Sequence, residues 1–464
     1  MQKVRPQNET KRDRNLFCAF LLALFCLYLL WAIVVPTSGA PDEKDRLLLS
    51  DYIFKYGTLP NGWDERVRIP LWGFSYAFYP YTTGIIGAFF MKIASVFTSA
   101  PHVLLVAARM PSVLSGLVTV TFCYKLGRKL SLARAYRWMF IFLLALLPQF
   151  SFLCGYVNND VFAMMTTTMI VYYWAAGISD NWSWSTCVKL AGALALCFLS
   201  YYNAYAYILC SVPLFILSQL CRPFRMQEVW TILKKGCLIV GIVFAIAGWW
   251  FIRNAILYDG DILGRATLRA CGEKYANQAF VAGRLTMREK GYTLIGMLFP
   301  PGSWIFLTYR SFIGMFGYMN LPMRSFVYAG VMTLYCGAMV SLVLGKLVQI
   351  KRRGKLCAQG ENQRGLRLLF FWMFAAMVIV VVCSIWYSYT SDYQPQGRYL
   401  MPAASSFFLA VTYGVHRFDD ALAGAFRKRA AWVHVVCPVA VCVCMVLLQI
   451  YAMTRIILPT YLAG

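Results

Sequence analysis

Two adjacent carboxylates, Asp42 and Glu43, stand shortly beyond the first apolar run of the chain. A carboxylate at the boundary between water and an apolar phase can act as a general base on a hydroxyl group. Burial raises the pKa of such a group and makes its carboxylate a better proton acceptor. The neighbouring acid would orient the base, bind a metal ion or hold the acceptor. The alternative is structural, because Pro41 and two acids suit the first turn of a helix in which Leu47–Leu49 and Tyr52–Phe54 recur at a helical spacing.

A third carboxylate, Asp160, follows Asn159 and opens an otherwise apolar segment in the stretch NNDVF. This motif suits a helix N-terminus, where Asn and Asp accept hydrogen bonds from free backbone N–H groups. It also suits a functional site, because ionisable side chains beside an apolar segment of membrane-spanning length often mark one. We therefore expect Asp160 and Asn159 to line a substrate cavity, with a helix cap as the alternative.

Arginines of two further motifs are candidates for binding phosphate. In QGRYLMP, Arg398 stands directly before a predicted helix, where a cation opposes the helix dipole. An anion held between Arg398 and the helix end would offset that cost, and phosphate binds at such ends. Arg253, in WWFIRN, offers several donors to a phosphate, although an arginine that only extends to the headgroup level is the ordinary alternative. Arg265 is a weaker candidate of the same kind.

These residues are carried by a chain that must lie largely in a membrane. Of its 464 residues 60% are hydrophobic and 14% charged, and many apolar runs approach bilayer length. No small-residue cleavage site follows the first run at the usual place, so we expect that run to remain as a span. The sequence predicts an all-α polytopic protein with roughly eleven crossings, at residues 15–35, 103–124, 138–157, 160–178, 190–203, 205–220, 236–252, 328–345, 368–387, 400–416 and 431–452.

The net charge of +25, from 44 Lys and Arg against 19 Asp and Glu, follows from this topology. One face carries most of the basic clusters, as cytoplasmic loops do; the clusters lie at residues 3–14, 125–137, 222–235, 346–367 and 427–429. We therefore expect a cytoplasmic N-terminus and an extracytoplasmic C-terminus, and nucleic acid is not needed to explain the charge. The external loop from Arg253 to Arg324 is also basic, either by drift or because it faces an anionic ligand.

Two long segments, residues 36–102 and 253–327, fall on the external face. Their apolar stretches are too short or too interrupted to span, so we expect juxtamembrane helices that roof a cavity. The runs at 190–203 and 205–220 are short for full crossings, and they form either short helices or a re-entrant pair. The side chains expected at the floor of the cavity are Tyr201, Tyr202, Asn203 and Tyr399.

Cysteines and histidines give no sign of a protein-bound metal. The sixteen cysteines lie mostly in apolar runs, and no CxxC or HxxxH spacing occurs. No disulfide framework is predicted, and no cofactor is required. Because acidic residues near a phosphate can hold a divalent ion, metal dependence stays open.

In their order along the chain, the motifs resemble the GT-C superfamily of polytopic glycosyltransferases, which use polyprenyl-phosphate-linked sugars, and within it the bacterial family DUF2142. The resemblance rests on PDE and an amphipathic helix ending in YGTLP, on NND, on WWFIRN followed by YDGD, and on QGRYLMP before a late span. It covers most of the chain. It implies a GT-C module in residues 1–235, followed by later spans in residues 236–464 of a single integral membrane unit.

The resemblance also implies roles for residues after the first span. In GT-C enzymes the aspartate of an acidic pair in this loop is taken as the catalytic base, which would be Asp42 here, with Glu43 in support. Relatives often have DExxH where this chain has DEKDR. Arg46 therefore stands at the histidine position and would contact a phosphate directly.

Together these patterns predict an inverting glycosyltransferase embedded among the lipids of a bacterial plasma membrane. It would move a sugar from undecaprenyl phosphate to a cell-envelope glycan or lipid on the outer face, with Asp42 as base and Arg253 and Arg398 at the phosphate. The alternatives are a transporter or flippase of lipid-linked sugars, which needs no base, and a structural membrane subunit. The catalytic hypothesis requires Asp42 to share one cavity with these arginines.

Overall fold

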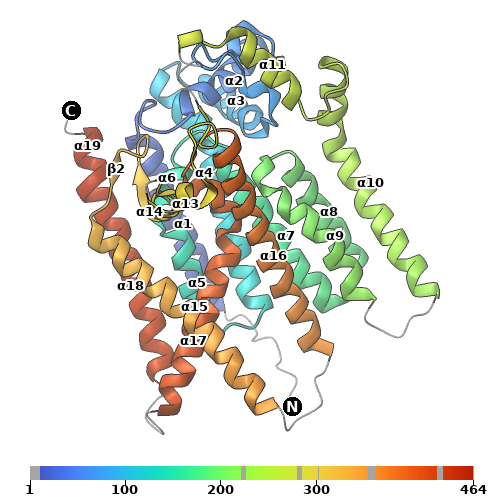
Figure 1. Ribbon diagram of the computed structural model, residues 1–464, viewed down its shortest axis with the longest axis vertical. Coiled ribbons are helices and arrows are strands. Elements are labelled where there is room, and N and C mark those ends of the chain that lie inside the picture. The colour runs from blue at the N-terminus through green and yellow to red at the C-terminus, as the bar shows by residue number, and fades with distance from the viewer. Residues whose placement is uncertain are drawn as a thin grey trace.

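The computed structural model describes residues 11–220, 226–279, 285–300, 302–353, 361–425 and 432–462. In these residues the protein is all-α apart from one antiparallel pair, β1 (Met315–Phe316) with β2 (Leu321–Pro322). Long helices run side by side along the long axis of the molecule, and shorter ones gather beyond one end of them (Figure 1).

Seven helices of the described residues are long and apolar enough to cross a membrane. They are α1 (Lys11–Val34), α4 (Pro101–Lys129), α7 (Asp160–Asp180), α10 (Met226–Leu257), α15 (Ser325–Arg353), α16 (Glu361–Thr390) and α18 (Val433–Ala452), which continues through η6 (Met453–Ile457) into α19 (Leu458–Leu462). The bent pair α5 (Arg134–Ala145) and α6 (Pro148–Cys154) would make an eighth. The 58° bend lies just before Pro148, whose ring cannot continue a helix from the preceding turn.

All eleven predicted spans coincide with helices, and the remaining three are α8 (Trp184–Phe198), α9 (Tyr205–Gln219) and α17 (Ala404–Ala425). Length and composition place only seven or eight helices among the candidate spans. α8 and α9 have 15 residues each, fewer than the roughly 20 that cross a bilayer. They meet at η3 (Tyr202–Ala204), which agrees with the prediction of a short or re-entrant pair.

The two long loops that we expected on one face do lie together. The first carries α2 (Glu43–Tyr56), η1 (Glu65–Val67), η2 (Tyr76–Phe78) and α3 (Thr82–Ser95), and the second carries α11 (Arg265–Tyr275), α13 (Leu294–Leu298) and α14 (Trp304–Gly314). α2, α3 and α11 share one end of the molecule, and α19 points toward that end (Figure 1). Residues 427–429 and parts of the basic clusters at 3–14, 222–235 and 346–367, which predicted the orientation, lie outside the described residues.

The two parts of the chain that we expected at 1–235 and 236–464 share a core. α5 packs against α17 and α18, and α9 packs against α16, so early and late helices alternate in space. Residue 235 lies inside α10, which therefore belongs to both parts. This interleaving brings segments that are distant in the sequence into contact.

A buried ion pair fixes the start of α2. Arg109 of α4 donates to both carboxylate oxygens of Glu43, at 2.7 and 2.6 Å, and both side chains are excluded from solvent. The third guanidinium nitrogen, Nη1, donates to the carbonyls of Ala32 and Val35, and the N–H of Val157 donates to Glu43. One pair thus ties together the end of α1, the start of α2, α4 and the loop before α7.

Breaking this pair should destabilise the whole end of the molecule. Arg109→Gln leaves the Glu43 carboxylate buried without a matched cation, a change that costs about 3–5 kcal/mol in comparable buried pairs. We expect a large fall in the thermal unfolding midpoint of the detergent-solubilised protein. The control is Arg66→Gln, because Arg66 pairs with Asp64 at the surface with half of its side chain exposed. Equal effects of the two changes would contradict the role given to Arg109.

Candidate active site

Asp42 occupies the residue just before α2 in a left-handed backbone conformation, with φ 60° and ψ 0°. Among non-glycine residues, Asp and Asn accept this conformation most readily. The carboxylate makes no capping hydrogen bond to α2. It instead accepts a hydrogen bond from Nη2 of Arg398 at 2.7 Å, so it is directed toward another part of the chain rather than used as a helix cap.

Arg398 reaches Asp42 because its own turn is packed very closely on α14. It lies in η4 (Gly397–Ala403), where the Gly397 N–H donates to Ser311 Oγ at 2.6 Å. A Cβ on Gly397 would stand 2.2 Å from the backbone nitrogen of Phe312, so only glycine fits here. Arg398 is 4% exposed and also donates to the Tyr399 hydroxyl. In this structure, the anion that we expected beside Arg398 is the Asp42 carboxylate.

Arg46 and Asp160 complete a charge cluster with Asp42 and Arg398. Arg46, one turn along α2 from Asp42, lies with its guanidinium 4.2 Å from the ring centre of Tyr76 and is nearly buried. Asp160 is the first residue of α7 and is also buried, and its charge interacts with both arginines. Two cations and two anions therefore occupy one sheltered region, which we call the charge cluster.

The pKa of Asp42 does not follow the expected direction. Burial raises it, but the charges of Arg398 and Arg46 and the hydrogen bonds from Arg398 and Tyr76 lower it by more, so the pKa lies below its ordinary value. The prediction that burial would leave Asp42 with a raised pKa is therefore wrong. Asp42 is ionised at neutral pH and available as a proton acceptor. Burial raises the pKa of Glu43 despite Arg109.

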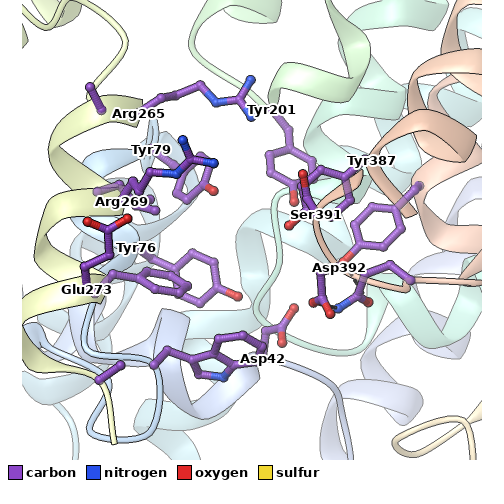
Figure 2. Close-up of a pocket in the computed structure, with 18 residues that line it drawn as sticks. Asp42, Tyr76, Tyr79, Tyr201, Arg265, Arg269, Glu273, Tyr387, Ser391 and Asp392 are labelled. Carbon is purple, nitrogen blue, oxygen red and sulfur yellow. Dashed lines mark hydrogen bonds between the residues drawn. The ribbon is translucent and has the colours of Figure 1, made fainter. Parts of the chain in front are cut away.

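A cavity of about 620 Å³ opens above Asp42 (Figure 2). Its residues come from the segment between α1 and α4, from α11, from the turn after α8, from the end of α16 and from the segment before η4. They are Asp42, Trp72, Phe74, Tyr76, Tyr79, Tyr201, Arg265, Ala266, Leu268, Arg269, Gly272, Glu273, Ala276, Tyr387, Ser391, Asp392, Gln394 and Tyr399. The volume suits a small ligand such as a sugar, and the six aromatic rings from the segment between α1 and α4 and from Tyr201 and Tyr399 offer faces for it.

Contacts with the segment between α1 and α4 hold α11 over this cavity. Gly73 has φ 72°, and a Cβ there would stand 2.2 Å from the nitrogen of Ala276. Cys271 donates its thiol to the Gly73 carbonyl at 3.3 Å. The close approach of these two backbones fixes which face of α11 meets the cavity.

Several predicted residues meet in or beside the cavity. Asp42, Arg265, Tyr201 and Tyr399 line it. Arg398 reaches it through Asp42 and Tyr399, and Arg46 lies over the rings of Tyr76 and Tyr201. Asp160 belongs to the charge cluster beneath it.

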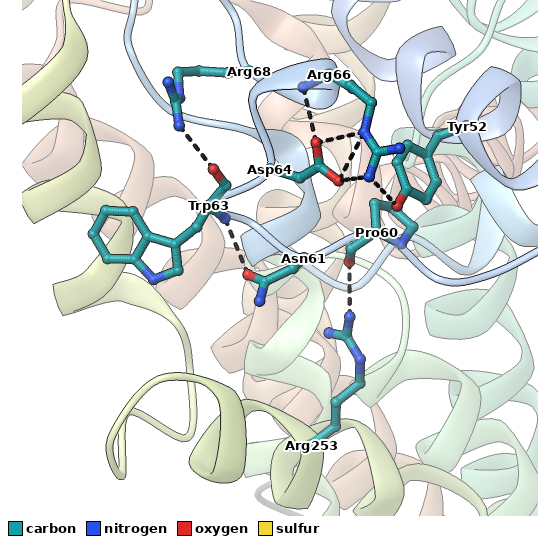
Figure 3. Close-up of polar contacts among 8 residues, drawn as sticks. All are labelled: Tyr52, Pro60, Asn61, Trp63, Asp64, Arg66, Arg68 and Arg253. Atoms are coloured by element: carbon teal, nitrogen blue, oxygen red, sulfur yellow. Dashed lines mark hydrogen bonds and ion pairs between the residues drawn. The ribbon is translucent and has the colours of Figure 1, made fainter. Parts of the chain in front are cut away.

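The other predicted residues hold the surrounding backbone. Arg253 is not among the cavity-lining residues; its Nη2 donates to the Pro60 carbonyl at 2.7 Å (Figure 3). Asn159 donates to the Pro80 carbonyl and accepts from Thr83.

Tyr202 and Asn203 are also outside the cavity lining. Tyr202 donates to the Leu263 carbonyl at 2.7 Å, and Asn203 donates to that of Tyr399 at 3.5 Å. These bonds join the turn between α8 and α9 to segments that border the site.

Some site residues were missed from the sequence although a signal was present. Arg269 and Glu273 follow the predicted Arg265 at intervals of four residues, which places all three on one face of a helix. Arg109 lies within a predicted span, where a charged side chain is costly and marks a functional or structural site. Tyr76 and Asp392 carried no such signal, because only the fold brings them to the cavity.

No arrangement of three His, Cys, Asp or Glu side chains suited to a metal ion occurs in the described ranges. The carboxylate expected to be available, Asp42, is paired with Arg398.

Comparisons with known proteins find solved structures with a similar fold. No family model and no curated protein matches the sequence. Among solved structures, the chain is similar to the oligosaccharyltransferase of Archaeoglobus fulgidus in its apo form, with a TM-score of 0.52 and 14% identity over 95% of this chain and 56% of that one. The same enzyme tethered to an acceptor peptide containing the NVT sequon gives 0.53 and 14%, over 95% and 55%. ArnT from Cupriavidus metallidurans in the apo state gives 0.39 and 14%, over 89% and 78%.

The two oligosaccharyltransferase structures, whose TM-scores exceed 0.5, show that the chain shares their fold over the part that it covers. Its described residues are all-α apart from one short strand pair and include seven or eight candidate membrane spans. The chain spans about half the length of the oligosaccharyltransferase structures that it matches.

The lowered pKa of Asp42 leads to a pH-dependent stability. A carboxyl group whose folded-state pKa is below its unfolded value of 3.8 stabilises the fold above that value, and this contribution is lost as the pH falls through the folded-state pKa. We expect wild type to exceed Asp42→Asn in thermal unfolding midpoint by a constant gap between about pH 5 and pH 8, narrowing below about pH 4. Asn keeps the left-handed backbone, so the comparison isolates the charge. A difference in unfolding midpoint that widens as the pH falls would contradict a lowered pKa of Asp42.

Proposed function

We propose that this protein is an inverting glycosyltransferase that moves a sugar from a polyprenyl phosphate to a cell-envelope glycan or lipid. The observation that carries the proposal is the Asp42 carboxylate, ionised and bonded to the buried Arg398 at the base of a cavity large enough for a sugar. The GT-C-like fold supports the same reaction class. Undecaprenyl phosphate is the proposed donor lipid and the outer face of a bacterial plasma membrane the proposed location.

In the proposed mechanism Asp42 accepts the proton of the acceptor hydroxyl. The hydroxyl oxygen forms a bond to the anomeric carbon, and the bond from that carbon to the phosphate oxygen breaks. Its electron pair stays on the lipid phosphate, whose growing negative charge is stabilised by Arg398 and Arg46. Both arginines stay protonated, because burial alone would lower the pKa of each but neighbouring groups hold it above the ordinary value.

The pairing of Asp42 with Arg398 gives the donor phosphate a second role in this proposal. In the structure, one carboxylate oxygen of Asp42 accepts from Arg398. A phosphate that draws on the donors of Arg398 weakens this bond and raises the basicity of Asp42. Binding of the donor would thereby activate the base only when there is a sugar to transfer.

Glu43 and Arg253 take positioning roles in the proposal. Glu43 fixes the backbone of its neighbour Asp42 through Arg109. Arg253 supports the Pro60 carbonyl in the first external loop, near the Tyr81 hydroxyl that donates to the same atom. Neither contact brings the side chain to the cavity.

The second candidate is a flippase for lipid-linked sugars, which the basic external loop and the short helices α8 and α9 would suit. A flippase needs a charged cavity but no proton acceptor. The left-handed Asp42, held against Arg398, favours the enzyme, because such strained residues gather at active sites.

The variant Asp42→Asn separates the two functions. In proteoliposomes with undecaprenyl-phosphate-linked sugars, we expect the variant to lose about 10²–10⁴-fold in transfer of labelled sugar, which is the usual share of a general base. Asp51→Asn, an acid on the same helix outside the cavity lining, serves as the control and should keep wild-type activity. Full transfer activity of Asp42→Asn would contradict the role of Asp42 as base. Wild type that flips the lipid-linked sugar but transfers none, with flipping unchanged in Asp42→Asn, would favour the flippase.

The arginines give a second test. Arg398→Lys keeps the charge but loses the planar fork, so we expect at least about tenfold weaker binding of undecaprenyl phosphate. Arg253→Lys should leave that binding within about twofold, because Arg253 contacts only the backbone of the first loop and aromatic side chains. If Arg253→Lys weakened undecaprenyl phosphate binding as much as Arg398→Lys, Arg253 would belong to the phosphate site.

A further inference from the structure

Two arginines that the proposed transfer does not use project from α11 into the cavity. Arg265 and Arg269 stand one turn apart on the lining face, and both are exposed (Figure 2). Neither guanidinium group makes a hydrogen bond or an ion pair with a described residue, and the backbone N–H of Arg265 is bonded to the Asp261 carboxylate. The nearby acid, Asp261, accepts instead from the backbone N–H and hydroxyl of Thr267 and so caps α11. The cavity therefore has a second group of cations whose donors are unoccupied.

This second group stands apart from the charge cluster. Arg398 and Arg46 lie beside Asp42, whereas Arg265 and Arg269 extend from a different wall, past Tyr76 and Tyr79 (Figure 2). If the phosphate draws on Arg398 and Arg46 beside Asp42, that end of the cavity is taken up by the reacting groups, and the body of the acceptor must extend away from it. The α11 wall is then the side on which the body of the acceptor lies.

We propose that Arg265 and Arg269 form an acceptor subsite for an anionic group of the phosphate class, carried near the hydroxyl that is glycosylated. The inference rests on the proposed function and deepens it, since it gives the acceptor a charge. Guanidinium groups bind phosphate through paired N–H donors, and two of them one helical turn apart can share one phosphate. In this assignment Arg265 belongs to the acceptor instead of the donor.

The same helix supplies two informative comparisons. Glu273 lies one turn beyond Arg269 and also lines the cavity, so its charge opposes an anionic acceptor. Lys274 carries the same charge as the arginines but does not line the cavity; its ammonium group lies 5.1 Å from the ring centre of Tyr275. A neutral variant at either position changes the charge of α11 by one unit. Glu273 lines the cavity and Lys274 does not, so the two variants separate a local effect from a general one.

The test measures binding of two probes to the purified full chain in lipid nanodiscs by equilibrium dialysis. Radiolabelled glycerol 1-phosphate, with glycerol as its uncharged counterpart, reports the acceptor subsite, and undecaprenyl phosphate reports the donor site. We expect the double variant Arg265→Gln/Arg269→Gln to weaken glycerol 1-phosphate binding at least about tenfold and to leave undecaprenyl phosphate within about twofold. Lys274→Gln should change neither, and Glu273→Gln should tighten glycerol 1-phosphate.

Three outcomes would overturn the subsite: wild type binds glycerol 1-phosphate no better than glycerol, Lys274→Gln weakens it as much as the double variant, or the double variant weakens undecaprenyl phosphate equally. The last result assigns the arginines to the donor. A failure of the proposed function has a different signature, because wild type then does not bind undecaprenyl phosphate or binds it independently of Arg398. That result removes the acceptor role together with the transfer.

Discussion

The buried pair of Glu43 with Arg109 is the constraint on which the rest of the site depends. Beyond each other, the two side chains bond three further groups, the carbonyls of Ala32 and Val35 and the N–H of Val157. The pair therefore sets where the first span ends and where α2 begins. Buried charges are costly unless every donor and acceptor is used, and here both carboxylate oxygens are. This requirement allows a single position for α2, and therefore for the neighbouring residue.

The consequence for Asp42 is a strained backbone and a side chain that faces away from its own helix. Two adjacent carboxylates thus have different partners and opposite pKa shifts. Burial raises the pKa of Glu43, whereas the pKa of Asp42 is lowered because two arginines outweigh the effect of burial. Neighbouring acids with separated pKa values are typical of sites in which one group reacts and the other holds it. In the proposed mechanism the reacting group is Asp42.

Charge balance gives the cavity two regions. At its base, Asp42 and Asp160 oppose Arg46 and Arg398, so the arginines are kept in place at low cost before any ligand binds. On the α11 wall the arginines have no such partners. An anion at the base must compete with two carboxylates that already neutralise the arginines, whereas Glu273, the lining carboxylate of α11, makes no ion pair with Arg265 or Arg269 among the described residues. This difference supports separate positions for a leaving phosphate and for an anionic acceptor.

The sequence by itself determined the class of molecule, since the composition and the apolar runs require a bundle of membrane helices and every predicted span is a helix. It also singled out Asp42 and Arg398, which stand at the starts of predicted helices, and Arg46 through the resemblance at the histidine position of DExxH. It could not decide between cap and base for Asp42, because a local motif fits both. Only the tertiary structure showed that the Asp42 side chain makes no capping hydrogen bond and accepts instead from a residue 356 positions away, at 2.7 Å. Likewise Arg253 turned toward a backbone carbonyl and Tyr76 toward the cavity, since such placements depend on packing between segments that carry no record of each other.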